Sequence, residues 1–157
     1  MALTQARRSR RVIHVEPDQL PSAWKNGAVV LAVTASITLV ALVVAAQAGM
    51  QLDFDRVDGR KVSVRPGIGV ISLALGVLVG TALLDLIGRR SPRAWMGVAW
   101  AGLAFGILST AAPLSSTAGT GVTTLLVSLH VLAGVTWFTV LTRSLRRAPA
   151  GDLQHDR

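Results

Sequence analysis

His130 lies near the middle of the apolar segment 121–141, where an ionisable side chain marks a candidate functional position. It belongs to a stripe with the spacing of one helix face, which we expect to face the interior of a helical bundle: Thr123, Val127, His130, Gly134, Trp137 and Leu141. Such a histidine is a candidate for a proton-sensitive switch or for contact with a polar solute. The structural alternative is a neutral histidine bonded to Thr38, at a similar depth in the first apolar segment, or to a buried carbonyl.

Asp85 is the second ionisable residue within an apolar segment, about one turn from the end of 67–88. A carboxylate in this place suggests proton or cation handling. Arg89 follows four residues later, however, which is the spacing of a helical ion pair, and we favour that pairing. Asp85 is too far along the helix axis to pair with His130, by roughly 13 Å of helix rise.

Other catalytic and metal-binding chemistry lacks residues at the required spacing. The absence of cysteine excludes disulfides, thiol nucleophiles and cysteine metal sites. His14, His130 and His155 are far apart, and none has a histidine or carboxylate at ligand spacing. The glycine-rich pieces 67–69 and 119–121 lack the Gly-Lys-Ser/Thr ending of a phosphate-binding loop. We therefore expect no metal, no cofactor and no enzymatic activity.

Four apolar segments position these side chains, and each is about as long as a bilayer is thick: 27–48, 67–88, 95–112 and 121–141. At about 1.5 Å per residue such segments span the ~30 Å hydrocarbon core, where the backbone has to be helical. Only 15% of the residues are charged, and almost all of them lie outside the segments. We expect an all-α membrane protein, with a four-helix transmembrane domain over 25–143 between cytoplasmic tails 1–24 and 144–157.

Small residues four apart indicate how the helices pack, because close backbone approach favours helix association in lipid. They are Ala28, Ala32 and Ser36, Gly76 and Gly80, and Gly102 and Gly106, with Gly134 on the His130 stripe. With short connections, these faces predict an antiparallel four-helix bundle. The glycine pairs suit either a homo-oligomer interface or packing within the chain, and we favour the second.

The basic residues indicate an orientation. Twelve of the sixteen lysines and arginines fall on one side of the predicted bundle: Arg7, Arg8, Arg10, Arg11, Lys25, Arg89, Arg90, Arg93, Arg143, Arg146, Arg147 and Arg157. By the positive-inside rule both termini are cytoplasmic, and Trp24 and Trp95 fall where an inner aromatic belt is expected. The net charge of +8 therefore does not indicate a nucleic-acid partner.

The same basic clusters suit anionic lipid headgroups within the surrounding lipid bilayer. The candidate residues follow the second and fourth segments: Arg89, Arg90, Arg93, Arg143, Arg146 and Arg147.

The connection 50–66 alternates apolar and polar residues around Asp58-Gly59, which is typical of a small extracytoplasmic β-hairpin. A three-residue loop sets Phe54 opposite Val64 and places the apolar residues on one face. Irregular backbone with a turn is the alternative.

Several short motifs carry a resemblance over about 25–143. Ser109 stands four residues before Pro113 at the outer end of the third segment, and Leu129-His130-Val131 forms the centre of the fourth. With the strand-like first connection and the arginine-rich second one, this layout resembles a family of uncharacterised four-helix integral membrane proteins, a domain of unknown function, of high-GC actinobacteria. The resemblance implies the four-helix fold and a bacterial inner (cytoplasmic) membrane, contributes no reaction, and makes Ser109, Pro113 and His130 positions to test.

Three classes of function remain. The leading one is an accessory or scaffold subunit that packs with other membrane proteins, because small-residue faces are plentiful and catalytic constellations are absent. The second is an oligomeric transporter or channel for a small solute or protons that uses His130, and it requires convergence of Thr34, Thr38, Ser72, Thr81, Thr123, Ser128 and His130. An intramembrane enzyme is third, and it requires a hydrophilic cavity with His130 and Ser109 within hydrogen-bond reach.

Overall fold

The computed structural model describes residues 20–50, 52–55, 61–63 and 65–147. Its four long helices are α1 (Ala23–Gln47), α2 (Pro66–Ile87), α3 (Pro92–Leu108) and α5 (Thr120–Arg147). With the short α4 (Ala111–Leu114) counted as a continuation of α3, each is long and apolar enough to cross a membrane. The prediction of four apolar helices is confirmed.

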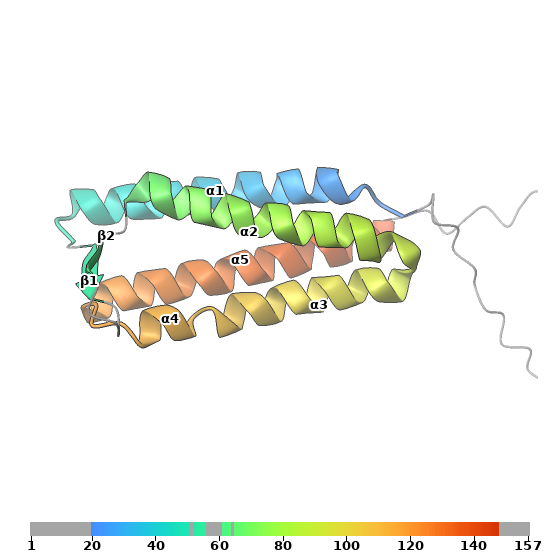
Figure 1. The fold of residues 1–157 in the computed structure, drawn as a ribbon. Coiled ribbons are helices and arrows are strands. Elements are labelled where there is room, and N and C mark those ends of the chain that lie inside the picture. The colour runs from blue at the N-terminus through green and yellow to red at the C-terminus, as the bar shows by residue number, and fades with distance from the viewer. Residues whose placement is uncertain (1–19, 51, 56–60, 64, 148–157) are drawn as a thin grey trace, which may run out of the picture.

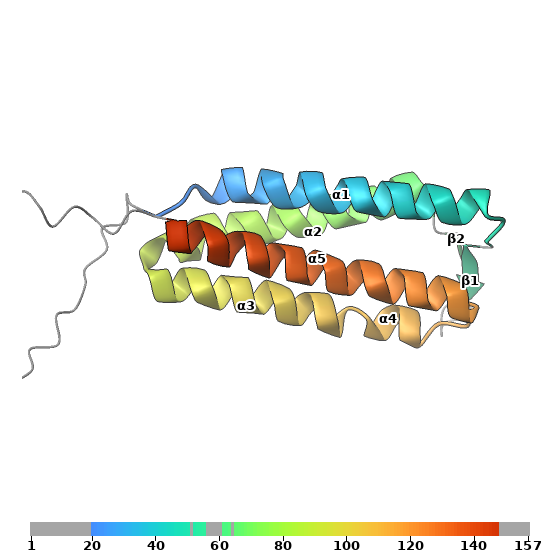
Figure 2. The ribbon, with the colours of Figure 1, turned by 180° about the vertical axis from the view of Figure 1, so that it is seen from behind.

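The helices run antiparallel in two closely packed pairs, α1 with α2 and α3 with α5 (Figure 1). The pairs meet through α1 against α5 and, less extensively, α2 against α3 (Figure 2). We call the end where α1 begins and α5 finishes the N/C end, and the opposite end the loop end. The turn η2 (Gly88–Arg90) joins α2 to α3 at the N/C end.

Large apolar side chains cover the outside of the helices. They include Val40 on α1, Leu86 on α2, and Phe105 and Leu108 on α3, which are 62%, 67%, 71% and 73% exposed. Contiguous apolar surface of this kind is unfavourable in water and suits the acyl chains of a bilayer. The exposure pattern is therefore compatible with a multi-pass membrane protein.

Local sequence signals explain where the helices begin and end. Ser22 and Ser91 are the N-caps of α1 and α3, since their Oγ atoms accept from the amides of Lys25 and Ala94. At the other end of α1, Gly49 has φ of 73°, and the amides of Gly49 and Met50 donate to Ala46 and Ala45. This is a Schellman motif, which turns the chain out of the helix.

The third predicted segment is not one continuous helix, because α3 ends at Leu108 and α4 begins at Ala111. Pro113 has no amide hydrogen to donate to the Ser109 carbonyl four residues earlier, and its ring crowds that carbonyl. The hydroxyls of Ser109 and Thr110 donate to the carbonyls of Gly106 and Ile107 at 2.9 and 2.6 Å. These bonds occupy backbone acceptors at the interruption.

The fourth predicted segment is longer than expected. Helix α5 continues six residues past Leu141 to Arg147, so the residues 144–147 of the predicted tail are helical. Arg146 and Arg147 lie in the last turn, where positive charge interacts favourably with the helix dipole.

Two three-residue strands, β1 (Asp53–Asp55) and β2 (Lys61–Ser63), pair antiparallel at the loop end. Phe54 lies opposite Val62, so the predicted register that set Phe54 opposite Val64 is wrong by two residues. The predicted Asp58-Gly59 turn falls outside the described residues, as do the side chains needed to test the apolar face.

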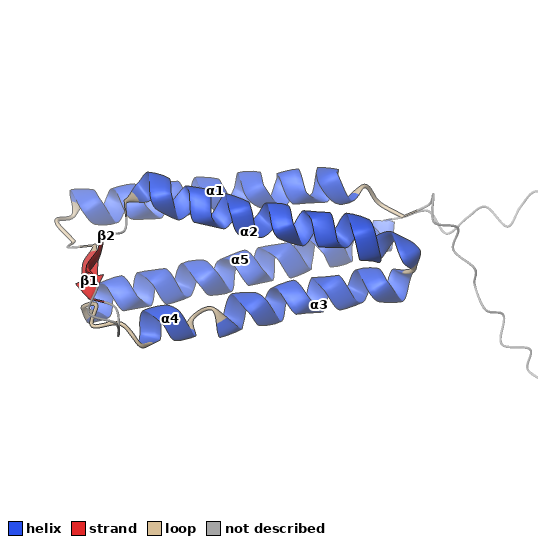
Figure 3. Cartoon of the chain, in the orientation of Figure 1, coloured by secondary structure: helices blue, strands red, loops and turns tan. Residues whose placement is uncertain are grey.

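Figure 3 shows the same arrangement by secondary structure, with the strands confined to the loop end and short loops between the helices. The core follows the helix contacts, and it contains Val30, Val77, Leu84, Trp95, Ala99, Trp137 and Leu141.

Candidate functional site

Trp137 of α5 connects three helices in the interior. Its indole N–H donates to the carbonyl of Val98 on α3 at 3.3 Å, and the ring covers Gly102 one turn further along α3. The far edge of the ring reaches α2, where a Cβ on Gly80 would lie 2.9 Å from Cη2. Two of the predicted packing glycines therefore make room for one buried indole rather than for a facing helix backbone.

Gly106 and Gly134 form the closest approach of α3 to α5. A Cβ on Gly106 would lie 2.7 Å from the Cα of Gly134 and 3.0 Å from the carbonyl oxygen of His130. Because these neighbours are backbone atoms, any side chain would push the helices apart. Gly76 differs from the other four predicted packing glycines, because a Cβ there meets nothing within 4 Å.

His130 lies half-buried on α5, one turn before Gly134. Its Nδ1 is 2.7 Å from the carbonyl of Leu126 in the preceding turn. A carbonyl accepts only, so Nδ1 carries the hydrogen of this bond. In the part of the chain that the structure describes, the partner of the ring is thus a carbonyl of its own helix and not Thr38.

Two of the buried threonines also bond along their own helices. Thr34 donates to Val30 and Thr81 donates to Val77, both at 2.7 Å. Thr38 is buried as well, while Ser72 and Ser128 are exposed on the surface. The polar residues considered for a solute path therefore do not all line one interior face.

Ser109 is the C-cap of α3, and its hydroxyl is used within the helix end by the bond to Gly106. Among the described hydrogen bonds none joins Ser109 to His130, although Gly106 lies near both: its carbonyl accepts from Ser109, and a Cβ on it would lie 3.0 Å from the His130 carbonyl oxygen. The structure explains the Ser109 and Pro113 motif as a helix interruption.

Asp85 is half-buried on α2 near the N/C end. The side chain of Arg89, its predicted partner, lies outside the described part of the chain. The ion pair stays a prediction.

Trp95 is not part of a lipid-facing aromatic belt, contrary to the sequence prediction. It is fully buried, and its indole N–H donates to the carbonyl of Leu141 at 3.2 Å, which fixes the start of α3 to α5 about two turns before α5 ends. Trp24, the other predicted belt residue, is 51% exposed. The prediction placed both tryptophans at the interface from their position in the sequence alone. A buried indole needs an acceptor for its N–H, here on another helix, and the local sequence does not reveal that acceptor.

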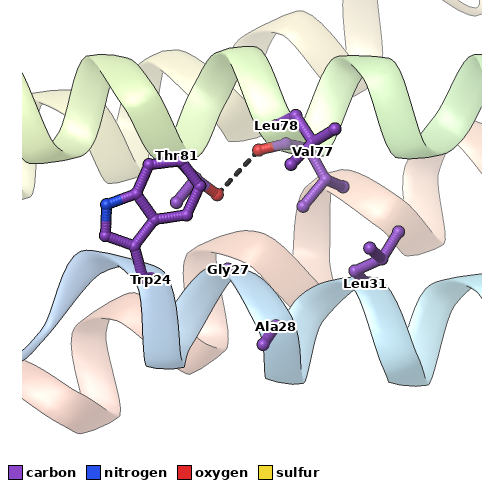
Figure 4. A pocket seen from close by; sticks show the side chains of 7 residues that line it. All are labelled: Trp24, Gly27, Ala28, Leu31, Val77, Leu78 and Thr81. Atoms are coloured by element: carbon purple, nitrogen blue, oxygen red, sulfur yellow. Dashed lines mark hydrogen bonds between the residues drawn. The ribbon is translucent and has the colours of Figure 1, made fainter.

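A partly enclosed groove of ≈ 130 Å³ lies between α1 and α2 near the N/C end (Figure 4). It is lined by Trp24, Gly27, Ala28, Leu31, Val77, Leu78 and Thr81. Gly27 lies against the Thr81 side chain, which brings the two helices together at this point. The sequence analysis missed this groove, and the Gly27-Ala28 pair beside Trp24 was the available signal.

Basic side chains are concentrated at the N/C end. Of the lysines and arginines whose side chains the structure describes, Lys25, Arg90, Arg93, Arg143, Arg146 and Arg147 are exposed at this end and Arg65 at the loop end. Within the described residues, no group of three or more histidine, cysteine or acidic side chains is placed to hold a metal ion.

Comparisons with known proteins agree with the extent of this helical unit. No curated protein and no solved structure shows significant similarity to the chain. The model of one family matches residues 18–147, which include all four long helices. The chain therefore belongs to DUF6069, a family of unknown function.

Proposed function

We propose that this protein is an accessory subunit in the bacterial cytoplasmic membrane and that it packs against a transmembrane helix of another membrane protein. The observation that carries the proposal is a small-residue stripe on the outside of α3. Gly97 and Ala101 are exposed four residues apart, and Phe105 and Leu108 continue the same face. A Cβ on Gly97 would meet nothing within 4 Å, so no described residue of the chain covers this position.

The two faces of α3 differ in a way that supports this proposal. Gly102 and Gly106 face inward and are filled by Trp137 and by the backbone of α5. Gly97 and Ala101 give α3 a second close-approach face, and the exposed aromatic Phe105 beside them offers a large contact surface. A small-xxx-small face flanked by bulky apolar residues is the usual interface between membrane helices.

The interior favours packing over transport. His130, Thr34 and Thr81 each satisfy a polar group by bonding to the backbone of their own helix. A conducting path needs polar groups that are directed into a shared lumen. No specific observation favours the transporter alternative. The hydrogen bonds of these side chains within their own helices suit a structural role.

We further propose that both termini are cytoplasmic and that anionic lipids surround the N/C end. The excess of exposed basic side chains at that end supports both statements through the positive-inside rule and through attraction to anionic headgroups. The lack of native cysteine allows a direct test with single substitutions. A membrane-impermeant maleimide should label Ser115→Cys in intact cells and Arg146→Cys only after permeabilisation, and the reverse pattern would contradict the orientation.

Site-directed crosslinking tests the packing proposal. Ala101→Cys carries a short photo-activated crosslinker on the α3 stripe. In the native membrane this variant should crosslink to one foreign membrane protein. Ala82→Cys on α2 is the matched control, since Ala82 is also an exposed alanine within a helix but lies away from the α3 stripe. Equal crosslinking from both positions, or a product made only of this chain, would contradict the proposal.

A further inference from the structure

We propose that the groove between α1 and α2 binds one acyl chain of an anionic phospholipid from the surrounding leaflet, with the lipid headgroup at the basic N/C end. This site is separate from the α3 stripe and does not depend on the proposed accessory function, whereas its headgroup contact rests on the proposal that anionic lipids surround the N/C end.

The shape of the groove suits an unbranched chain. On the α1 side, Ala28 adds almost no bulk between Trp24 and Leu31 and leaves room for an occupant (Figure 4). The space beside Gly27 is filled by the Thr81 side chain, which forms the floor of the groove. Val77 and Leu78 of α2 form the facing wall. At ≈ 130 Å³ the groove is smaller than the ~300–1,000 Å³ typical of small-molecule sites, and it fits a segment of hydrocarbon chain.

The lining is apolar in character. The hydroxyl of Thr81 donates to the Val77 carbonyl at 2.7 Å, as the dashed line in Figure 4 shows, so its hydrogen is already used within α2. The remaining lining residues present hydrocarbon or ring atoms. An occupant therefore gains dispersion contacts along the groove.

Charge and position identify the occupant as an anionic lipid. Lys25 is exposed next to Trp24, and Arg90 and Arg93 are exposed at the same end of the bundle. In Figure 4 the indole nitrogen of Trp24 lies on the side of the ring toward the beginning of α1, where a headgroup would be. Among the described residues near this end Asp85 is the acidic one, and the described basic residues there outnumber it. Tryptophan and basic residues together are the usual anchors at the headgroup level.

Native mass spectrometry of the full chain, released from nanodiscs that contain equal amounts of phosphatidylglycerol and phosphatidylethanolamine, tests the site. Ala28→Phe fills the groove from α1, and Ala32→Phe is the control, because Ala32 is exposed one turn further along α1 and does not line the groove. We expect one retained phosphatidylglycerol in the wild type and in Ala32→Phe, and its loss in Ala28→Phe. Lys25→Gln should lower the preference for phosphatidylglycerol by about fivefold, the effect of one basic residue near the surface.

Leu78→Trp fills the groove from α2 and serves as a second variant if Ala28→Phe unfolds, which circular dichroism will detect. Loss of the retained lipid in this variant supports the site in the same way. Equal lipid retention by the wild type and both filled variants would overturn the proposal. So would equal retention of the two lipids by the wild type, which is the behaviour of nonspecific annular lipid.

Discussion

Gly106 of α3 and Gly134 of α5 meet backbone to backbone, so that a Cβ on Gly106 would lie 2.7 Å from the Cα of Gly134. This contact holds the two helices at a separation that only glycine allows. The contact lies one turn from His130. The carbonyl of Gly106 also accepts a hydrogen bond from the Ser109 hydroxyl.

Gly106→Ala should therefore destabilise the bundle by about 1–3 kcal/mol, the usual cost of overpacking. Gly97→Ala on the same helix is the control, because its Cβ meets nothing within 4 Å and loss of a helical glycine stabilises by roughly 0.5–1 kcal/mol. Unfolding in mixed detergent micelles measures both changes. Equal stability of the two variants would show that α3 and α5 are not in close contact at Gly106.

Trp95→Phe should cost about 1–3 kcal/mol, because it leaves a space in the core and removes the bond from the indole to the Leu141 carbonyl. Trp24→Phe is the matched control, since Trp24 is half exposed, and it should change the stability little. The same unfolding assay distinguishes a buried anchor from a residue of the aromatic belt. A larger loss of stability in Trp24→Phe than in Trp95→Phe would show that Trp95 is not a buried anchor and belongs to the aromatic belt.

His130→Leu should leave the bundle folded, with a change in stability below about 1.5 kcal/mol. The imidazole bonds only to the Leu126 carbonyl among the described hydrogen bonds, and a bond of this kind in a membrane contributes roughly 0.6 kcal/mol. Purification yield and thermal unfolding in detergent give the measurement. Failure to insert or to fold would reveal a structural bond that leucine cannot replace.

Pro113→Ala should extend the helix through the interruption between α3 and α4. The new amide at position 113 can donate to the Ser109 carbonyl, and the local helix penalty of about 3 kcal/mol for proline is removed. Hydrogen exchange across 109–114 should become slower, whereas exchange across 103–107 should stay unchanged as an internal control. Unaltered exchange at 109–114 would assign the interruption to the hydroxyls of Ser109 and Thr110 instead.

The sequence predicted the helices well, because length and apolar composition are sufficient for a membrane span. It did not predict which face of α1 points inward. Thr34 and Thr38 are buried, whereas Ala28, Ala32 and Ser36, which were expected to form a packing face, are exposed. A helix that is apolar on all sides has little periodic signal, so small residues outside and threonines inside could not be distinguished.

The interior contacts were also only partly predictable. Gly102 was recognised as a packing residue, but its partner is the ring of Trp137 and not a helix backbone. Which distant side chain fills a glycine gap depends on the crossing of α3 with α5, which the local sequence does not determine. The interruption after Leu108 had a local signal in Pro113, but the predicted segment ran through it to 112.

The mass of the intact assembly, released from native membranes in mild conditions, tests the accessory function most directly. We expect the wild type and Ala82→Leu to carry one foreign membrane protein at a fixed stoichiometry. Ala101→Leu should lose this protein while keeping its fold, because a leucine on the α3 stripe prevents close helix approach. A bare monomer or a homo-oligomer of the wild type, or a partner retained by Ala101→Leu, would show that the protein is not such a subunit.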